Sequence, residues 1–215
     1  MSVEIKKRHE ERFDRWSKVY DRSVLQMLIF NTSHNMFFKE MAPYIKDGMK
    51  VLDIGCGTGK FAYRLCNINK DARIHGIDIS GDMIKKAEAK RRDENIEFKV
   101  GDVENLPYDS HTFDVITCSN SFHHYPNQKR AVAEMHRVLK EDGKLMIVDG
   151  CRDRLLGKVI FGIVEIVEGD VYHIFENELR NMLMSVGFDK VKQRKFNPMA
   201  PLLFTMGHAT KEKKL

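Results

Sequence analysis

The stretch Val51-Leu-Asp-Ile-Gly-Cys-Gly-Thr-Gly59 decides the fold class of this chain. Its first part belongs to a short apolar run, residues 50–54, that is typical of a buried strand. Its second part is a loop with three glycines, and the pattern predicts a helix over residues 60–66. A strand that passes through a glycine loop into a helix is the opening unit of a parallel α/β sheet.

Further units of the same kind follow along the chain. The sequence predicts strands at 73–79, 96–100, 113–118 and 144–149, with helices at 82–92 and 128–139 between them. Ser80 is placed to cap the first of these helices. Strands that alternate with helices at this spacing predict a doubly wound, mostly parallel sheet with helices on both faces.

The two ends of the chain have different patterns. Residues 9–30 are predicted to be helical, with Phe13, Trp16 and Tyr20 on one apolar stripe. After an apolar segment at 155–167, a helix is expected at 176–186, ended by Gly187, and two strands at 191–196 and 202–209. No linker or repeat interrupts the chain, so we expect one domain over residues 1–215.

Composition excludes several classes of protein. The 36 Lys and Arg exceed the 31 Asp and Glu by only five, and much of that excess lies at the two ends. Solvated tails explain this better than binding to nucleic acid, because no basic stripe is interleaved with aromatic residues. The longest apolar stretch is too short and too charged to span a bilayer.

The four cysteines have no spacing typical of a metal site, so we expect no bound metal. They are interpreted as reduced thiols of a cytoplasmic protein, and the N-terminus lacks the apolar core of a signal peptide.

The glycine loop limits the ligand that it can hold. A dinucleotide fingerprint would need glycine at position 60, where Lys60 stands, and a P-loop would need a terminal Gly-Lys-Ser/Thr. Asp53 lies two residues before the first glycine, where a carboxylate would repel a pyrophosphate. The same carboxylate suits the ammonium of an amino acid. The loop therefore favours S-adenosylmethionine over a nicotinamide cofactor.

Two further acids end predicted strands. Asp78 comes about 20 residues after the loop, where an acid commonly binds ribose hydroxyls. Asp102 follows the next strand, where it can accept a hydrogen bond from an adenine amino group while Val103 offers its backbone amide. A plain turn role is the alternative for Asp102.

These residues carry a resemblance that covers nearly the whole chain. The chain resembles class I S-adenosylmethionine-dependent methyltransferases, in the small-molecule branch that includes the ubiquinone/menaquinone C-methyltransferases. The matching segments are 51–59, 76–80, 101–107, 113–116 and the late stretch 175–188.

The resemblance implies a Rossmann-like sheet of seven strands that ends in an antiparallel hairpin. Residues 1–45 would form N-terminal lid helices, 46–150 the cofactor-binding half, and 151–215 an acceptor-side insertion and the hairpin. The residues that would contact the cofactor are Asp53, Gly55, Gly57, Asp78, Ile79, Asp102, Val103, Ser119 and, from the lid, Tyr20. Core packing is an equal alternative for Tyr20. The product would be S-adenosylhomocysteine.

Departures from the family narrow the acceptor only in part. The signature stretches of the quinone enzymes are not evident, and Cys118-Ser-Asn-Ser121 replaces the Asn-Pro-Pro-Tyr element of nucleic-acid amine methyltransferases. We expect a small, apolar or aromatic acceptor, with residues 155–167 in its pocket wall. The alternatives are a membrane-borne lipid or quinone acceptor, or a non-catalytic partner subunit. The oligomeric state stays open, a homodimer included.

Catalysis needs little beyond alignment, because the methyl donor is already activated. A base is required only if the acceptor loses a proton. His124 is the first candidate for a base or orienting residue and His123 the second, since both follow the fourth predicted strand. A structural role is an equal alternative, and His173 is a further candidate.

Overall fold

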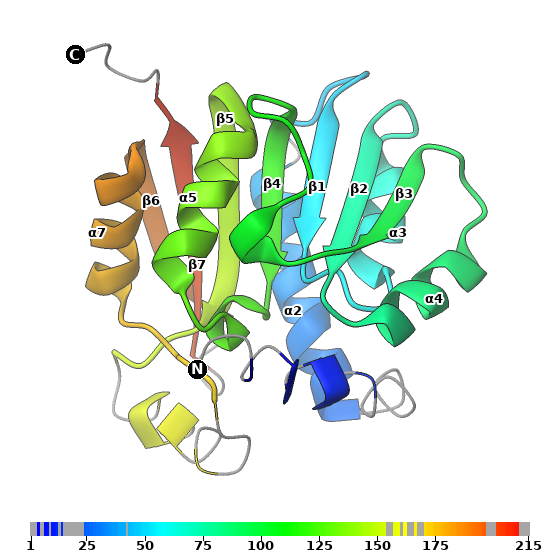
Figure 1. Cartoon of the computed structure of the whole chain (residues 1–215). Coiled ribbons are helices and arrows are strands. Elements are labelled where there is room, and N and C mark those ends of the chain that lie inside the picture. The colour runs from blue at the N-terminus through cyan, green and yellow to red at the C-terminus, as the bar shows by residue number, and fades with distance from the viewer. Residues whose placement is uncertain are drawn as a thin grey trace.

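A seven-stranded sheet with the strand order β3-β2-β1-β4-β5-β7-β6 forms the centre of the protein in the computed structural model. The structure describes residues 4, 7, 8, 10–12, 14, 24–41, 43–153, 157–159, 161, 162, 166, 170–196 and 201–210, and only the backbone of 24–30. The order and the helices on both faces confirm the doubly wound α/β fold (Figure 1).

The strands run close to their predicted bounds, except that β5 begins five residues earlier and β6 three residues earlier than predicted. They are β1 (Lys50–Ile54), β2 (Arg73–Asp78), β3 (Ile96–Val100), β4 (Phe113–Ser119), β5 (Leu139–Gly150), β6 (Phe188–Phe196) and β7 (Leu202–Ala209). Strands β1 to β5 are parallel neighbours in the sheet. Strand β7 pairs antiparallel with both β5 and β6, so the last two strands form the expected hairpin.

The helices are α2 (Val24–Met41), α3 (Lys60–Ile68), α4 (Gly81–Lys90), α5 (Gln128–Val138) and α7 (Glu176–Val186), with short 3-10 turns η2 (Val103–Asn105) and η3 (Phe122–His124). The predicted caps are confirmed. The Ser80 hydroxyl accepts from the Met83 amide at the start of α4. Gly187 ends α7 with φ +116°, a left-handed conformation that glycine adopts without strain.

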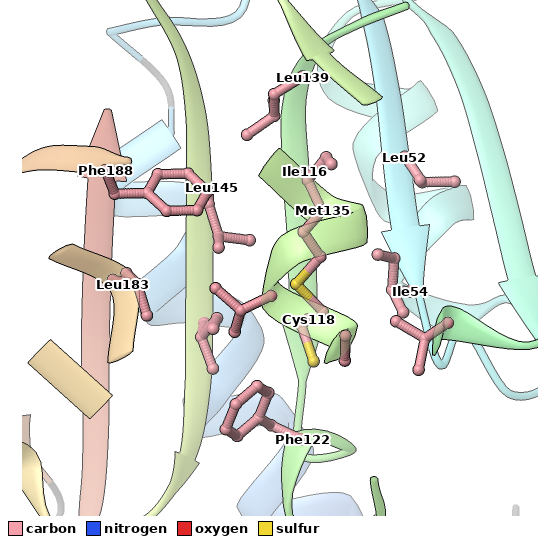
Figure 2. Close-up of a cluster of buried hydrophobic side chains, with 14 of the residues drawn as sticks. Leu52, Ile54, Ile116, Cys118, Phe122, Met135, Leu139, Leu145, Leu183 and Phe188 are labelled. Carbon is pink, nitrogen blue, oxygen red and sulfur yellow. The ribbon is translucent and has the colours of Figure 1, made fainter. Parts of the chain in front are cut away.

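Two apolar layers hold the helices on the sheet. Leu52 and Ile54 of β1 face one layer, where they meet Met135 of α5 (Figure 2). Val51, between them in the alternation of the strand, faces the opposite layer with Phe37 of α2 and Phe61 of α3. Because both faces are covered, only the ends of the strands are left for a ligand.

The N-terminal helical region differs from the prediction. Helix α2 continues to Met41, eleven residues past the predicted end at residue 30. Its second half holds Asn, Thr, Ser and His, which favour helices weakly. The fully buried Phe37 packs on Phe61 and Phe204 and gives this half its stability.

No helix among the described residues is long and apolar enough to cross a membrane. All four cysteines are buried and free.

Candidate active site

The strand order reverses between β1 and β4. From β1 the chain continues to β2 and β3 on one side, and it then returns to β4 on the other. The loops after β1 and β4 therefore diverge at the carboxyl end of the sheet, which is where doubly wound folds bind ligands. Figure 1 shows the described parts of the N-terminal segment, in dark blue, at this same end.

The glycine loop turns sharply at this point. Gly55, Gly57 and Gly59 have φ values of +68°, +53° and +77°, which only glycine adopts without strain. A Cβ on Gly55 would lie 2.4 Å from the Ser121 hydroxyl oxygen, so the loop after β4 packs directly on the loop after β1. A Cβ on Gly57 would meet no atom of the described residues within 4 Å. Gly57 thus borders the open side of the loop, where a ligand would lie.

Asp53 is the most buried acid of the loop, with 2% of its surface exposed. It pairs with Thr117 of β4 in the sheet register, and the Thr117 hydroxyl donates to Oδ1 at 3.0 Å. Its other oxygen, Oδ2, is buried and accepts no hydrogen bond from the described residues. Burial raises the pKa of Asp53 to about 7, and the neighbouring Asp78 charge adds to the rise although the Thr117 hydrogen bond opposes it. A cationic ligand group at Oδ2 would satisfy this carboxylate.

Asp78 lies one strand away, at the end of β2. Its Oδ2 accepts from the Gly57 amide at 2.8 Å and its Oδ1 from the Ser80 amide at 2.9 Å. The carboxylate therefore ties the glycine loop to the start of α4. Burial raises its pKa, against these hydrogen bonds. Ile79 follows, half-buried, in the same loop.

The third acid, Asp102, lies at the same edge of the sheet as Asp53 and Asp78, and these three acids are called the cofactor row. The Gly101 amide donates to the Asp78 carbonyl at 2.9 Å, which brings the loop after β3 beside the loop after β2. The half-buried Asp102 accepts from the Glu104 amide at 2.9 Å, and the buried Val103 opens the turn η2. Asp102 therefore stabilises a turn and also occupies the position expected of an acid that contacts adenine.

Ser119 ends β4, half-buried, and its hydroxyl accepts from the Asn120 side chain at 3.2 Å. The predicted Tyr20 lies outside the described residues, as do Phe13 and Trp16.

His123 and His124 belong to η3, just after β4, and their ring centroids are 4.0 Å apart. His124 is buried, and its Nδ1 accepts a hydrogen bond from the Arg12 guanidinium at 3.2 Å, since arginine can only donate. His123 contacts Asp149, the penultimate residue of β5, through its ring Nδ1 at 2.6 Å. The structure thus gives the two histidines different partners.

Sequence reasoning missed Asp149, Thr117 and Arg12. Asp149 ends an apolar strand in the same way as Asp53 and Asp78, and that signal was available. The ligating atoms of His123, Asp149 and His173 lie within 4.8 Å of one another, although the sequence shows no metal-ligand spacing. Such long-range clusters are invisible to spacing, because the three residues come from η3, β5 and the segment before α7.

The site fits S-adenosylmethionine on its own geometry. The buried Oδ2 of Asp53 suits an ammonium, and the open side of Gly57 leaves room for the chain that carries it. Asp78 and Asp102 follow at the ends of the next two strands, in the direction in which a ribose and an adenine would extend. When bound, this cofactor supplies a methyl group on a sulfonium, already activated for transfer.

Known proteins agree with this assignment. Residues 45–199 match the family model described as a methyltransferase domain. The chain is 36% identical over 103 residues to the uncharacterized methyltransferase YcgJ of Bacillus subtilis, covering 46% of this chain and 40% of that protein. It is 33% identical over 151 residues to the demethylmenaquinone methyltransferase of Thermotoga maritima, covering 69% of this chain and 64% of that protein. The chain thus spans less than two thirds of these relatives' lengths.

A solved structure shares the fold over nearly the whole chain. It is the putative methyltransferase in complex with the Trm112 methyltransferase activator of Haloferax volcanii, with a TM-score of 0.76, 19% identity, and coverage of 93% of this chain and 98% of that one. Because the family model matches residues 45–199, the assignment rests on sequence similarity as well as on the shared fold. The chain belongs to the methyltransferase domain family.

Proposed function

We propose that the chain methylates a small, apolar or aromatic acceptor that loses a proton during the reaction. The observation that carries this proposal is the link between the glycine loop and the histidine turn. Ser121 packs on Gly55 and donates to the Ile54 carbonyl at 3.2 Å, and His123 follows two residues later. Imidazoles therefore border the edge at which the methyl group would be presented.

The chain's own residues have separable tasks in this proposal. Asp53, Asp78, Asp102 and the backbone of Gly55, Gly57, Ile79 and Val103 hold the cofactor, with Ser119 beside its methionine end and Tyr20 in the lid. His123 is the group that takes the proton. His124 orients the edge of the site by accepting a hydrogen bond from Arg12. Proton removal by a positioned imidazole contributes typically about 100-fold or more to a rate.

The division of the chain into a lid, a cofactor-binding half and an acceptor side is part of the same proposal. Residues 1–215 act as one domain, with 1–45 as the lid, 46–150 holding the cofactor and 151–215 on the acceptor side. Phe161, from the predicted pocket wall, stacks on His173 at a centroid distance of 4.4 Å, which supports an aromatic wall beside the histidines.

The test is a turnover assay with a methyl-labelled donor and a panel of hydroxyl, thiol, amine and activated-carbon acceptors, with quinones included because of the relative named above. Product mass identifies the methylated compound. His123→Ala should lower turnover by roughly 100-fold while S-adenosylhomocysteine affinity stays within about twofold. His124→Ala should weaken cofactor affinity as well as turnover, because His124 also holds Arg12.

Three outcomes separate the alternatives. Turnover only with quinones or phospholipids in vesicles supports the membrane-borne acceptor. Two results together support the non-catalytic role. The chain would bind the cofactor but methylate no acceptor of the panel, and a partner subunit would methylate its own acceptor only when this chain is present. Equal loss in both histidine variants would contradict the separate tasks given to them. Light scattering of the same samples measures whether the chain is a homodimer.

A further inference from the structure

The His123 residue is fixed at three of its polar atoms. Asp149 accepts twice from it, with Oδ1 2.6 Å from ring Nδ1 and Oδ2 3.1 Å from the backbone nitrogen. The His123 carbonyl accepts from the Tyr172 amide at 2.6 Å. The side chain of Asp149 is 5% exposed and that of His123 is 14% exposed, so a buried carboxylate holds a ring that solvent can still reach.

A second observation shows that this arrangement is built into the fold. The ring of His173 stacks on that of His123, with centroids 4.5 Å apart and planes 10° from parallel, and Phe161 stacks on His173. A Cβ at Gly150 would lie 2.6 Å from Phe161 and 2.8 Å from His173. The glycine directly after Asp149 therefore makes room for the stacked rings.

The geometry favours a hydrogen-bonded pair over a metal site. Zinc bonds of about 2.0–2.1 Å at tetrahedral angles keep two ligand atoms roughly 3.3 Å apart. The 2.6 Å between Nδ1 of His123 and Oδ1 of Asp149 is a charge-assisted hydrogen bond instead. An imidazole also binds an ion in its own ring plane, and two stacked, nearly parallel rings do not share such a plane.

We propose that Asp149 is a positioning residue that holds His123 as the proton acceptor of the methyl transfer. This inference rests on the proposed function. Because Asp149 accepts at Nδ1, that nitrogen carries the hydrogen in the neutral ring, and the lone pair is on Nε2.

The acceptor atom forms its bond to the methyl carbon as the carbon–sulfur bond breaks, and the electron pair of that bond stays on sulfur. The proton of the acceptor goes to Nε2 of His123, and the resulting imidazolium lies against the Asp149 carboxylate. Solvent takes this proton before the next turnover.

Among the described residues, the titratable and charged groups around His123 come from several elements. Asp149 comes from β5, His124 from η3 and His173 from the segment before α7. Arg12 lies beyond His124, and Arg152 adds its charge near His173. Burial raises the pKa of Asp149, but the charges and hydrogen bonds around it, His123 first, outweigh burial and hold that pKa below its usual value. The carboxylate is therefore ionised at neutral pH, as the positioning role requires.

The test is nitrogen-15 NMR of the histidine rings in the full-length protein, which reads the tautomer and the pKa of each ring without an acceptor. In the wild type, His123 should be the tautomer with hydrogen on Nδ1. Asp149→Asn should lower the measured pKa of His123 by about 1 or more, since an opposite charge stabilises the charged form. Asp114→Asn is the matched control, because Asp114 pairs with Lys140 at 2.8 Å near the start of β4.

Calorimetry with S-adenosylhomocysteine on the same samples separates this inference from the proposed function. Retained binding with the expected pKa change supports the positioning role. Hydrogen on Nε2 in the wild type overturns it, even if Asp149→Asn does not fold. An unchanged His123 pKa in that variant also overturns it. So does zinc chloride binding at micromolar affinity that His123→Ala and His173→Ala both abolish, since that would make the cluster a metal site.

Discussion

Arg12 donates a hydrogen bond from Nη2 to Nδ1 of His124 at 3.2 Å, although 112 residues separate the two in sequence. Arg8 pairs with Asp170 at 3.0 Å from the same N-terminal segment. Asp14, also in this segment, bonds to the Ser80 hydroxyl beside the cofactor row. The described residues of the N-terminal segment thus contact loops on both sides of the switch point, as a lid would.

Removal of residues 1–23 should leave a folded sheet but weaken binding of S-adenosylhomocysteine by about tenfold or more, which corresponds to about 1.4 kcal/mol. The reason is the loss of the contacts made by Arg12 and Asp14. Calorimetry gives the affinity, and circular dichroism checks the fold. Lys7→Ala, at an exposed position, is the matched control. Unchanged affinity in the truncated chain would show that the segment is no lid.

Asp53→Asn should change the pH dependence of stability. The folded pKa of about 7 lies above the usual value of 3.8, so the folded state holds a proton that the unfolded state has released between about pH 4 and pH 7. Wild-type stability therefore falls over this window, whereas the variant lacks this loss. At about pH 8 the variant should be more stable than the wild type by up to about 4 kcal/mol, relative to their difference at about pH 4.

Urea unfolding of both proteins across this range gives the difference directly. The same substitution should weaken S-adenosylhomocysteine binding by about 1–3 kcal/mol, because it removes the charge opposite the ammonium. A stability difference that does not vary with pH would contradict the buried, partly protonated Asp53.

Two glycines of the loop should separate folding from binding. Gly55→Ala places a Cβ 2.4 Å from the Ser121 hydroxyl oxygen and also strains a positive φ, so it should lower stability by about 2 kcal/mol or more. Gly57→Ala strains φ and meets no atom of the described residues, so it should cost about 1 kcal/mol yet abolish most cofactor binding by filling the cradle. Gly81→Ala, with open space and ordinary φ, is the control. Equal losses of stability at Gly55 and Gly57 would refute the separation.

The sequence predicts the sheet well because its signals are local. The apolar runs, the Ser80 cap and the Gly187 stop all depend on near neighbours in the chain, and each is confirmed. The second half of α2 was missed because its own Phe37 stabilises it by packing on Phe61 of α3. Local propensity cannot register such a contact.

The cofactor row is predictable for the same reason. Asp53 lies one residue before the end of β1, Asp78 ends β2 and Asp102 follows β3, and parallel strands bring their carboxyl ends to one edge. The partners of the histidines are different, because Asp149 and Arg12 meet them only through the folded arrangement of β5 and the N-terminal segment. The sequence therefore identifies His123 and His124 as candidates but does not show which task each of them has.

Calorimetric titration with S-adenosylhomocysteine, with NAD as the competing ligand and Asp78→Ala as the variant, tests the cofactor assignment most directly. The wild type should bind one equivalent of S-adenosylhomocysteine and no NAD. Asp78→Ala should weaken that binding by about 1–3 kcal/mol, because it removes both the predicted ribose contact and the carboxylate that holds the Gly57 amide. Tight binding of NAD without binding of S-adenosylhomocysteine would contradict the account.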